Sequence, residues 1–347
     1  MLAAPLTSDV FPPTRPGLAA VAVVVPCYRE TAHILDVLAK IGPEVDAVYV
    51  IDDCCPDNTA EIVEKQCADP RVRIIRHDKN KGVGGATMTG YRQALADGFQ
   101  VMVKMDGDGQ MDGALIPRLI APIVEGAADY TKGNRFHALR GISEMPWTRI
   151  FGNLVLSLAS KFSSGYWDIL DPTNGYTAIN AAALEKLPLE KIAEGYFFES
   201  DMLFHLGMVR AVVRDVPMIA KYGAEQSGIQ IPRIVPVFMF KHIANTCRRL
   251  LFSYFVRETS IASLQLVFGS LLVLFGVIFG AINWIDGEMS GIPATAGTVV
   301  LAALPIILGS QSLIAFINYD TRNLPTQPLQ SLDEELPNAM SNPRDPA

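Results

Sequence analysis

An Asp-Gly-Asp-Gly-Gln segment at residues 106–110 has the residue types and the spacing to bind a divalent metal ion. Asp106 and Asp108 offer two carboxylates on a turn loosened by glycine, and Gln110 adds an amide oxygen. Such hard oxygen ligands suit Mg²⁺ or Mn²⁺, which keep several waters and also bind the phosphates of a substrate. A solvated acidic turn has the same composition, so the surrounding elements decide which interpretation holds.

Alternating strands and helices are predicted around this segment. Continuous apolar, β-branched runs indicate buried strands, and helical spacing of apolar residues indicates helices. The predicted strands are 19–26, 47–51, 72–76 and 99–105, and the helices between them are 31–41, 59–67 and 85–97. This alternation predicts an α/β fold with an open, mostly parallel sheet that carries helices on its faces.

Polar residues follow three of the predicted strands, at the point where each strand ends. Tyr28 and Glu30 follow the first strand, Asp52-Asp53 the second, and the 106–110 segment the fourth. In open parallel sheets, ligands bind at the carboxyl ends of the strands, near the point where strand order reverses. The coincidence predicts an active site at this edge and favours metal binding by the DxD pair.

The glycine-rich segment Gly82-Val-Gly84-Gly85 follows the third predicted strand. A dinucleotide-binding fingerprint would follow the first strand and would carry the full GxGxxG spacing. Two other interpretations remain open for this segment, a close approach of the backbone to a nucleotide and the N-terminus of a helix.

Six segments give the chain a family resemblance. They are VVVPCYRE, VIDDCCPDNT, NKGVGGA, MDGDGQMD, KGNRF and DPTNGYTA, in that order. Their order and spacing resemble those of family 2 glycosyltransferases, most closely the branch of dolichyl-phosphate mannose synthase and bacterial polyprenyl-phosphate glycosyltransferases. The resemblance covers residues 21–227. It implies a GT-A type, Rossmann-like fold and a UDP- or GDP-sugar donor.

The same resemblance implies which residues hold the donor. The nucleoside side of the site would be formed by residues after the first two strands, and the diphosphate would be bridged by the metal. With the glycine turn added, the expected donor-binding residues are Pro26, Tyr28, Glu30, Asp52, Asp53, Gly82, Asp106 and Asp108. The expected metal ligands are Asp106, Asp108 and Gln110, for Mg²⁺ or Mn²⁺.

The second half of the site follows from further matches to the family. Gly133-Asn-Arg135 matches a Gly-Ser-Arg segment, Arg149 matches a second arginine, and Asp171 opens an Asp-x-Thr-Ser-Gly-like segment. Glu199 stands at an acidic helix start. The resemblance makes Asp171, Arg149 and Arg135 the candidate catalytic residues, with helix capping as the alternative for Asp171 and Glu199.

An acceptor phosphate would need cations. The guanidinium groups of Arg135 and Arg149 are suited to binding it, although both could be surface cations. The family's Asp-Arg pair after a Val-Pro strand reads Lys221-Tyr222 here, which makes Lys221 and Arg233 the remaining acceptor-side candidates. A lipid phosphate is already anionic, so its transfer reaction requires positioning more than a general base.

Two long apolar stretches lie near the C-terminus. Residues 261–284 and 290–319 contain no charged side chain, and each exceeds the roughly 20 residues that cross a bilayer core. Transmembrane helices are therefore expected at about 261–284 and 294–317, and buried soluble helices are the alternative. Residues 231–258 predict an amphipathic helix at the membrane interface, with an ordinary surface helix as the alternative.

Loop charges predict the orientation. Arg248, Arg249 and Arg257 precede the first span, whereas the Asp286-Gly-Glu288 turn between the spans has no basic residue. The positive-inside tendency then places the catalytic domain and both termini in the cytoplasm, with the protein in the inner membrane.

The domains expected are a disordered 1–17, a catalytic domain at 18–230, the interface helix at 231–258, a membrane hairpin at 259–320 and a disordered tail at 321–347. The expected partners are the nucleotide-sugar, polyprenyl phosphate and the lipid bilayer, and a homo-oligomer is left open. The net charge of −7 argues against nucleic acid.

The expected activity is inverting transfer of one sugar to polyprenyl phosphate at the cytoplasmic face of the membrane. A processive polysaccharide synthase shares the early motifs, but it would need more spans and a Gln-x-x-Arg-Trp segment. A catalytically silent, nucleotide-binding membrane scaffold is the alternative from another class. Such a protein tends to lose its acidic ligands, which are present here.

Overall fold

A computed structural model describes residues 19–136, 147–218 and 231–332. The chain divides into two compact units. The first contains the described residues up to Ile243 together with those from Pro325 onward, and the second spans Ala244–Leu324. The predicted disordered segment 1–17 lies outside the described residues.

The first unit is built on a seven-stranded sheet with the order β3-β2-β1-β4-β6-β5-β7. Its strands are β1 (Val21–Cys27), β2 (Ala47–Asp52), β3 (Val72–Arg76), β4 (Val101–Lys104), β5 (Tyr130–Asn134), β6 (Thr177–Asn180) and β7 (Val213–Pro217). Strand β6 runs antiparallel to both of its neighbours, and the other pairs are parallel. The predicted open, mostly parallel sheet is confirmed, and all four predicted strands are present.

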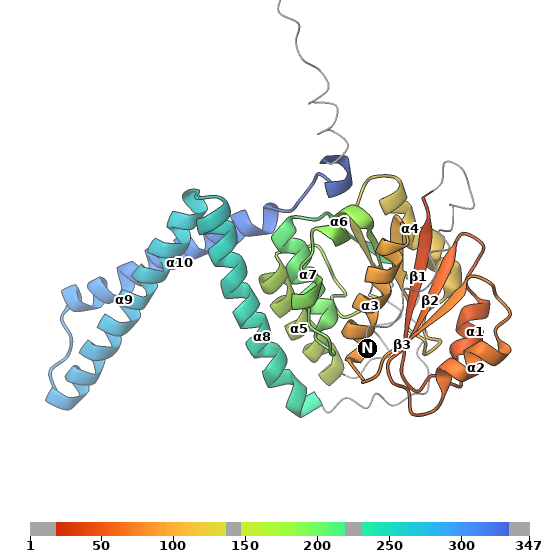
Figure 1. Ribbon diagram of the computed structural model, residues 1–347. Coiled ribbons are helices and arrows are strands. Elements are labelled where there is room, and N and C mark those ends of the chain that lie inside the picture. Colours follow the sequence, from red (N-terminus) through yellow and green to blue (C-terminus); the bar gives the residue numbers. More distant parts are fainter. Residues whose placement is uncertain (1–18, 137–146, 219–230, 333–347) are drawn as a thin grey trace, which may run out of the picture. The chain divides into compact units, whose positions relative to one another are not determined.

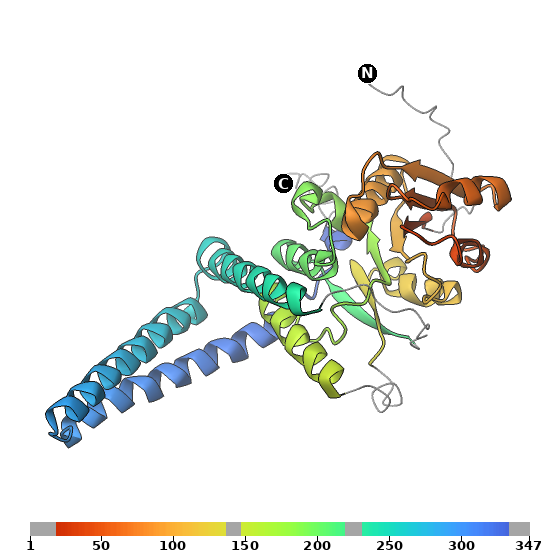
Figure 2. The ribbon, with the colours of Figure 1, turned by 90° about the horizontal axis from the view of Figure 1, so that it is seen from below.

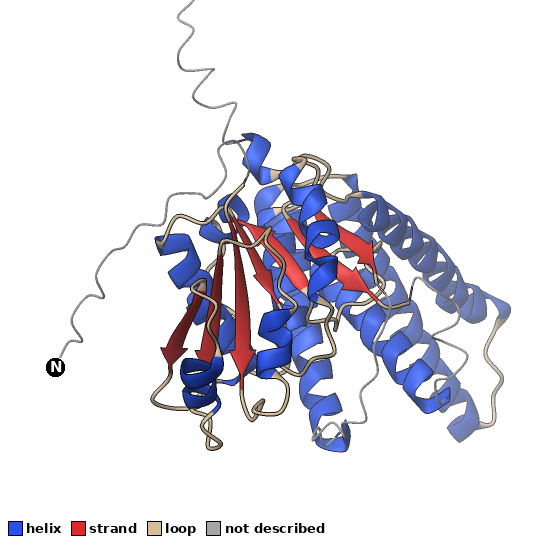
Figure 3. Ribbon diagram, turned by 90° about the vertical axis from the view of Figure 1, so that its right-hand side faces the viewer, coloured by secondary structure: helices blue, strands red, loops and turns tan. Residues whose placement is uncertain are grey.

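The helices of this unit cover the sheet (Figures 1 and 3). They are α1 (Ile34–Ala39), α2 (Thr59–Gln66), α3 (Gly82–Ala96), α4 (Ile116–Val124), α5 (Trp147–Ser164), α6 (Ala181–Glu185) and α7 (Phe198–Val209), with short 3-10 turns η1 (Gly113–Leu115) and η3 (Leu189–Lys191). The three helices predicted between the first strands correspond to α1, α2 and α3, and α3 begins three residues earlier than predicted.

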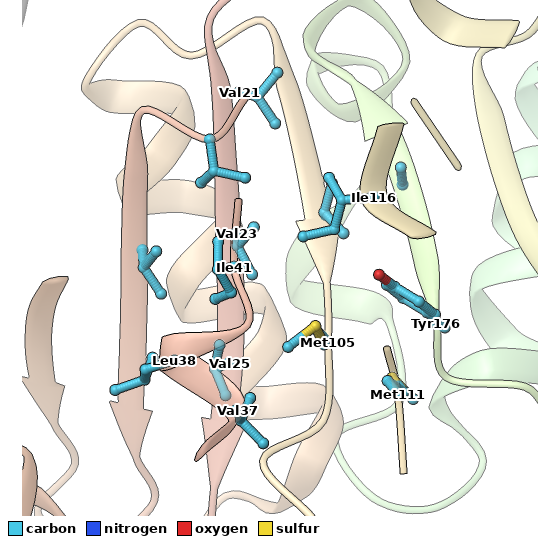
Figure 4. Close-up of a cluster of buried hydrophobic side chains, with 14 of the residues drawn as sticks. Val21, Val23, Val25, Val37, Leu38, Ile41, Met105, Met111, Ile116 and Tyr176 are labelled. Atoms are coloured by element: carbon cyan, nitrogen blue, oxygen red, sulfur yellow. The ribbon is translucent and has the colours of Figure 1, made fainter. Parts of the chain in front are cut away.

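One face of the sheet carries a core cluster of buried apolar residues. Val21, Val23 and Val25 alternate along β1 and pack with apolar residues of α1 and α4, as Figure 4 shows for Val37 and Ile116. Successive side chains of a strand point to opposite faces, so the intervening Val24 faces the other layer. There a Cβ on Gly90 of α3 would lie 2.3 Å from Val24, and glycine permits this close contact.

The second unit begins within α8 (Ile231–Leu251). A π-helical turn (Phe252–Arg257) follows, and then two long apolar helices, α9 (Ile261–Ser290) and α10 (Ala296–Arg322), run side by side (Figure 2). A Cβ on Gly276 would lie 2.7 Å from Ala302 O, so the two helices approach closely at this glycine. The acidic turn predicted at Asp286–Glu288 is wrong, because helix α9 continues to Ser290.

A buried charge cluster fixes the start of this hairpin. Arg249 donates hydrogen bonds to both oxygens of Asp320 at 2.7 and 3.0 Å, and Tyr254 donates one to the same carboxylate at 2.5 Å. These bonds tie α8 and the π-helical turn to the end of α10. The pairing satisfies a charge that would otherwise be buried at a large free-energy cost.

Helix α8 has both buried polar residues and exposed apolar residues. Its polar residues His242, Asn245 and Arg249 are buried, whereas Phe240 and Ile243 are 73% and 59% exposed. His242 lies 2.8 Å from Ser163 Oγ at the end of α5, and burial lowers the pKa of His242 to about 4. The helix therefore turns its polar face toward protein and an apolar face outward.

The tail departs from its predicted disorder over residues 321–332. Thr321 and Arg322 complete α10, and Leu329 is buried in the first unit. The backbone N–H of Leu329 donates to both oxygens of the fully buried Asp129, at 2.8 and 3.0 Å. This contact joins residues 200 positions apart, so sequence composition gave no local sign of it. Residues 333–347 lie outside the described part.

Candidate active site

The DxD turn leaves the carboxyl end of β4 in the middle of the sheet. Gly109 has a φ of +75°, which favours glycine, and it lets the turn fold back so that Asp108 Oδ1 accepts a hydrogen bond from Gln110 N at 2.9 Å. Asp106 Oδ1 lies 2.8 Å from the ammonium of Lys104, the last residue of β4. A Cβ at position 107 would lie 3.2 Å from Cys27 Sγ, a tight contact that glycine avoids.

A cavity of about 140 Å³ opens at this turn. It brings together residues from the segments that follow β4, β5 and β7, from the loop before β6 and from helix α7. Its lining consists of Asp106, Asp108, Gln110, Met111, Arg135, Thr173, Asn174, Gly175, Glu199 and Met218. Five predicted site residues are therefore in one place: the three candidate metal ligands, Arg135 and Glu199.

Arg135 and Asp171 form a two-point ion pair beside the cavity. Arg135 Nε donates to Asp171 Oδ2 at 2.7 Å and Nη2 donates to Oδ1 at 2.9 Å, while the backbone N–H of Arg135 lies 3.2 Å from Oδ2. Asp171 is fully buried, whereas 30% of the Arg135 side chain is exposed. The carboxylate is thus engaged by the arginine, and its geometry fits orientation of Arg135 better than proton abstraction.

A half-buried aspartate supports this pair. Asp215 Oδ2, on β7, accepts hydrogen bonds from Asn134 Nδ2 and from the backbone N–H of Leu170, each at 3.0 Å. It therefore joins the end of β5, where Arg135 follows, to the loop that carries Asp171. Burial raises the pKa of Asp215 to about 6.

Three residues of the loop 171–175, Thr173, Asn174 and Gly175, line the cavity. Asn174 donates to Gly133 O at 2.7 Å, and its own carbonyl accepts a hydrogen bond from the ammonium of Lys132. Lys132 is fully buried, and this burial lowers the pKa of its ammonium to about 8. A Cβ on Gly175 would lie 2.5 Å from Lys104 Nζ, so only glycine lets the loop lie this close to the lysine.

Two aspartates, Asp52 at the end of β2 and Asp53 directly after it, accept hydrogen bonds from nearby backbone N–H groups. Asp52 Oδ1 accepts from Cys55 N at 2.7 Å. Asp53 is 2% exposed, and its oxygens accept hydrogen bonds from Lys81 N at 2.8 Å and Gly82 N at 2.7 Å. His77 Nδ1 lies 2.7 Å from Asp53 Oδ1. Both Asp53 oxygens are therefore engaged within the protein, and its predicted contact with the donor stays a prediction.

Gly82 begins helix α3 with a φ of +79°, in agreement with the helix N-terminus left open by the sequence. The following glycines approach the 193–195 segment. Gly84 N and Gly85 N donate to Glu194 O at 2.7 and 3.1 Å, and a Cβ on Gly84 would lie 2.3 Å from Ala193 O. Close packing against this backbone explains the small residues without a nucleotide.

The residues after β1 lie next to the DxD turn but outside the cavity lining. Pro26 is buried within β1, and Tyr28 is 43% exposed. Arg29 adopts a left-handed φ of +65° and stacks over the Tyr28 ring, with 5.3 Å between the guanidinium carbon and the ring centroid. Glu30 is half-buried, and a Cβ on Gly107 would lie 3.3 Å from its Cγ. An exposed tyrosine is suited to stacking on a nucleobase, which agrees with its predicted role.

Three predicted cations are not placed. Arg149 and Arg233 lie in the first turns of α5 and α8, where their side chains are outside the described part of the chain. Lys221 lies outside the described residues. Their expected contacts with an acceptor phosphate stay predictions.

Sequence reasoning missed several contributors, among them Lys104 and Met218. A signal was available for the lysine, because a charged residue near the end of the apolar run FQVMVKM requires a partner if the strand is buried. Met218 gave no such signal, since a methionine after a strand is ordinarily a core residue.

Comparison with known proteins defines the class. Residues 22–188 match the family described as Glycosyl transferase family 2. Undecaprenyl-phosphate mannosyltransferase from Micrococcus luteus is 30% identical over 203 residues, which cover 57% of this chain and 82% of that protein. UDP-N-acetylglucosamine–dolichyl-phosphate N-acetylglucosaminyltransferase from Methanococcus voltae is 29% identical, with 58% of this chain and 85% of that protein covered.

Fold and sequence together define an enzyme of the glycosyltransferase class. The chain belongs to glycosyl transferase family 2. Among solved structures, that of glucosyl-3-phosphoglycerate synthase from Mycobacterium tuberculosis in complex with Mn²⁺, uridine diphosphate and glucosyl-3-phosphoglycerate is similar with a TM-score of 0.48 and 19% identity. This match covers 67% of this chain and 80% of that one.

Proposed function

We propose that this glycosyltransferase transfers a single sugar from a nucleotide-sugar to polyprenyl phosphate at the cytoplasmic face of a membrane. The supporting observation is the cavity at the carboxyl ends of β4 and β5, which has carboxylates on the DxD turn and a buttressed guanidinium at Arg135. Such a cavity can accept a donor diphosphate with its metal ion and an anionic acceptor together. The relatives from Micrococcus luteus and Methanococcus voltae bear names that describe transfer to polyprenyl phosphates, which supports this acceptor.

The reaction needs one bond to form and one to break. An oxygen of the acceptor phosphate attacks the anomeric carbon of the sugar while the bond from that carbon to the donor diphosphate breaks. The nucleoside diphosphate leaves, and attack from the opposite side inverts the configuration. The acceptor is already an anion, so no side chain has to remove a proton from it.

Arg135 has a defined task in this proposal. Two anionic substrates repel each other, and a fixed guanidinium between them offsets that repulsion in a partly dry cavity. Asp171 holds Arg135 at two points, which sets the direction of the remaining N–H groups. Asp215 and Asn134 keep the two supporting segments together.

A divalent ion fits the residues of the DxD turn. Asp106, Asp108 and Gln110 all line the cavity, which provides oxygen ligands from one side only. Within the described residues no group of three acidic, histidine or cysteine side chains converges to form a metal cage. Mg²⁺ and Mn²⁺ tolerate such a one-sided site, because substrate phosphates and waters complete their shell. The ion would neutralise the charge of the departing diphosphate.

The exposure of long apolar helices supports membrane attachment. Helices α9 and α10 are long and apolar enough to cross a bilayer, and only 22% and 11% of their most apolar windows are buried. A core helix of a soluble protein would be mostly buried, so these helices fit a lipid environment better. On the first unit, α5 also exposes Leu154 and Leu158, and α8 exposes Phe240. These apolar residues are suited to the membrane interface, where a lipid phosphate is found.

Release of nucleoside diphosphate tests the proposal. The purified full-length protein is given each of a panel of UDP- and GDP-sugars with Mn²⁺ or Mg²⁺, and nucleoside diphosphate is measured with and without short-chain polyprenyl phosphate. We expect one donor to give rapid release that depends on the lipid phosphate. The unphosphorylated polyprenol is the matched control and should not stimulate release. Equal release with polyprenol, or release that needs no acceptor, contradicts the proposed acceptor.

A further inference from the structure

A buried lysine ends the strand that leads into the DxD turn. Lys104 is the last residue of β4, and only 1% of its side chain is exposed. Its ammonium lies 2.8 Å from Asp106 Oδ1 and 3.3 Å from Glu199 Oε1. One internal cation is therefore shared between a predicted metal ligand and a carboxylate of helix α7, both of which line the cavity.

The loop above this cation keeps it in place. A Cβ on Gly175 would lie 2.5 Å from Lys104 Nζ and 2.7 Å from Asp106 Oδ2. The backbone at Gly175 thus covers the ion pair closely, and there is no space for the ammonium to move past it.

We propose that Lys104 is a positioning residue that competes with the divalent ion for Asp106 and so weakens metal binding in the absence of the donor. Its ammonium occupies one oxygen of Asp106 and offsets part of the negative charge that Asp106, Asp108 and Glu199 give the cavity. The donor diphosphate would supply further ligands for the ion, so tight metal binding would require the donor. This inference rests on the proposed function only in requiring that the cavity binds a divalent ion.

The Mn²⁺ affinity of the donor-free protein tests the inference. Free Mn²⁺ is measured by electron paramagnetic resonance during titration of the full-length protein in a neutral detergent. Lys104→Met removes the ammonium with a side chain of similar length. We expect Mn²⁺ to bind about tenfold more tightly, the effect that one neighbouring charge typically has on a carboxylate. Unchanged or weaker binding in the folded variant overturns the inference, because a lysine needed only for folding does not compete with the metal.

Lys132→Met is the matched control. Lys132 is a second fully buried lysine of the same sheet, but its ammonium donates to the carbonyl oxygen of Asn174 rather than to a cavity carboxylate. The control should leave the Mn²⁺ affinity near that of the wild type. If it tightens binding as much as Lys104→Met does, a general change of charge explains the effect and direct competition for Asp106 is wrong.

A double variant separates competition from net charge and also serves if Lys104→Met does not fold. Lys104→Met with Glu199→Gln removes one cation and one anion, so the charge of the cavity is unchanged while Asp106 loses its ammonium partner. Tighter Mn²⁺ binding by this variant supports the inference, and wild-type affinity contradicts it. A wild-type protein that binds no Mn²⁺ even with the donor present would instead overturn the metal dependence of the proposed function.

Discussion

Each carboxylate of the site has its own partner, and the partner limits what that carboxylate can do. Asp171 is held at two points by Arg135, Asp53 accepts two backbone N–H groups, and Asp106 faces Lys104. Asp108 accepts a hydrogen bond within its own turn and lines the cavity. These contacts make Asp108 the strongest candidate for a direct metal ligand and Asp171 a positioning group.

Replacement of Asp108 tests the metal site. Asp108→Asn removes one charge without changing the volume, so we expect activity to fall by about a hundredfold or more, given the several kcal/mol that a bound metal supplies. Asp112→Asn is the matched control, since Asp112 caps the η1 turn through Ala114 N at 3.2 Å and is outside the cavity lining. Initial rates with Mn²⁺ and with excess EDTA check this expectation. Full wild-type activity in EDTA would contradict metal dependence.

Replacement of Arg135 tests the acceptor site. Arg135→Lys keeps the charge but loses the planar two-point grip, so the Michaelis constant for polyprenyl phosphate should rise. A charged hydrogen bond of about 1.5–3 kcal/mol corresponds to a change of roughly ten- to a hundredfold. Arg214→Lys on the exposed surface of β7 is the control and should change neither constant. If only the constant for the nucleotide-sugar rises, Arg135 belongs to the donor diphosphate.

The sequence predicted most of the candidate site residues, but it did not predict which of them contact one another. The DxD turn, Arg135, Asp171 and Glu199 stand in short motifs, and the structure gathers them around one cavity or beside it. The partnership of Lys104 with Glu199 joins residues 95 positions apart, so it depends on the sheet order. Local spacing cannot reveal such a contact, and the predicted roles of Asp53 and Asp171 in binding and catalysis stay predictions.

At the scale of the elements, the first four strands were predictable because their apolar runs are continuous, whereas β5 and β7, which pair in parallel, were not predicted. Strand β6 was missed, since it runs antiparallel and has only four residues, Thr177–Asn180. Its insertion between β4 and β5 separates the DxD turn from Arg135 by one strand, and this spacing makes room for the loop 171–175. The width of the cavity therefore depends on an element that local periodicity did not indicate.

The pH dependence of stability tests the support behind Arg135. Burial raises the pKa of Asp215 to about 6, above its unfolded value of about 4, so its ionisation costs stability as pH rises between these values. Asp215→Asn removes that cost, whereas its amide oxygen can still accept from Leu170 N. Relative to the wild type, the variant should gain about 1–3 kcal/mol between about pH 4 and pH 7.

Unfolding followed by tryptophan fluorescence at both pH values checks this gain. Asp97→Asn is a suitable control, because Asp97 pairs with Arg73 on the outer edge of the sheet. Equal shifts of the two variants, or a loss of relative stability for Asp215→Asn at the higher pH, would show that Asp215 is not buried as an ionised group.

At the scale of the whole molecule, the chain returns to the catalytic domain after its apolar hairpin. The first unit contains both Ile243, before the hairpin, and Leu329, after it. Leu329 is bound through Asp129, and Gln330 Nε2 also donates to Ile123 O at 3.0 Å. A hairpin of two spans between these points would keep both of its ends on the same side of a bilayer, which agrees with the proposed orientation.

Thiol labelling tests this topology. Ala294→Cys places a thiol in the connection between α9 and α10, and a membrane-impermeant maleimide should label it from outside in spheroplasts that express the protein. The wild type provides the control, because its exposed Cys54 lies in the catalytic domain and should react only after the membrane is permeabilised. Labelling of Cys54 in sealed spheroplasts would place the catalytic domain on the outer face.

The mass of the lipid product tests the central claim most directly. Full-length protein in vesicles is incubated with its preferred nucleotide-sugar, Mn²⁺ and short-chain polyprenyl phosphate, and the lipid fraction is analysed by mass spectrometry. We predict a single new species, polyprenyl phosphate that carries one sugar, which is absent with Asp108→Asn. A ladder of lipids with several sugars would indicate a processive enzyme. Donor consumption without any glycosylated lipid would contradict transfer to a lipid phosphate.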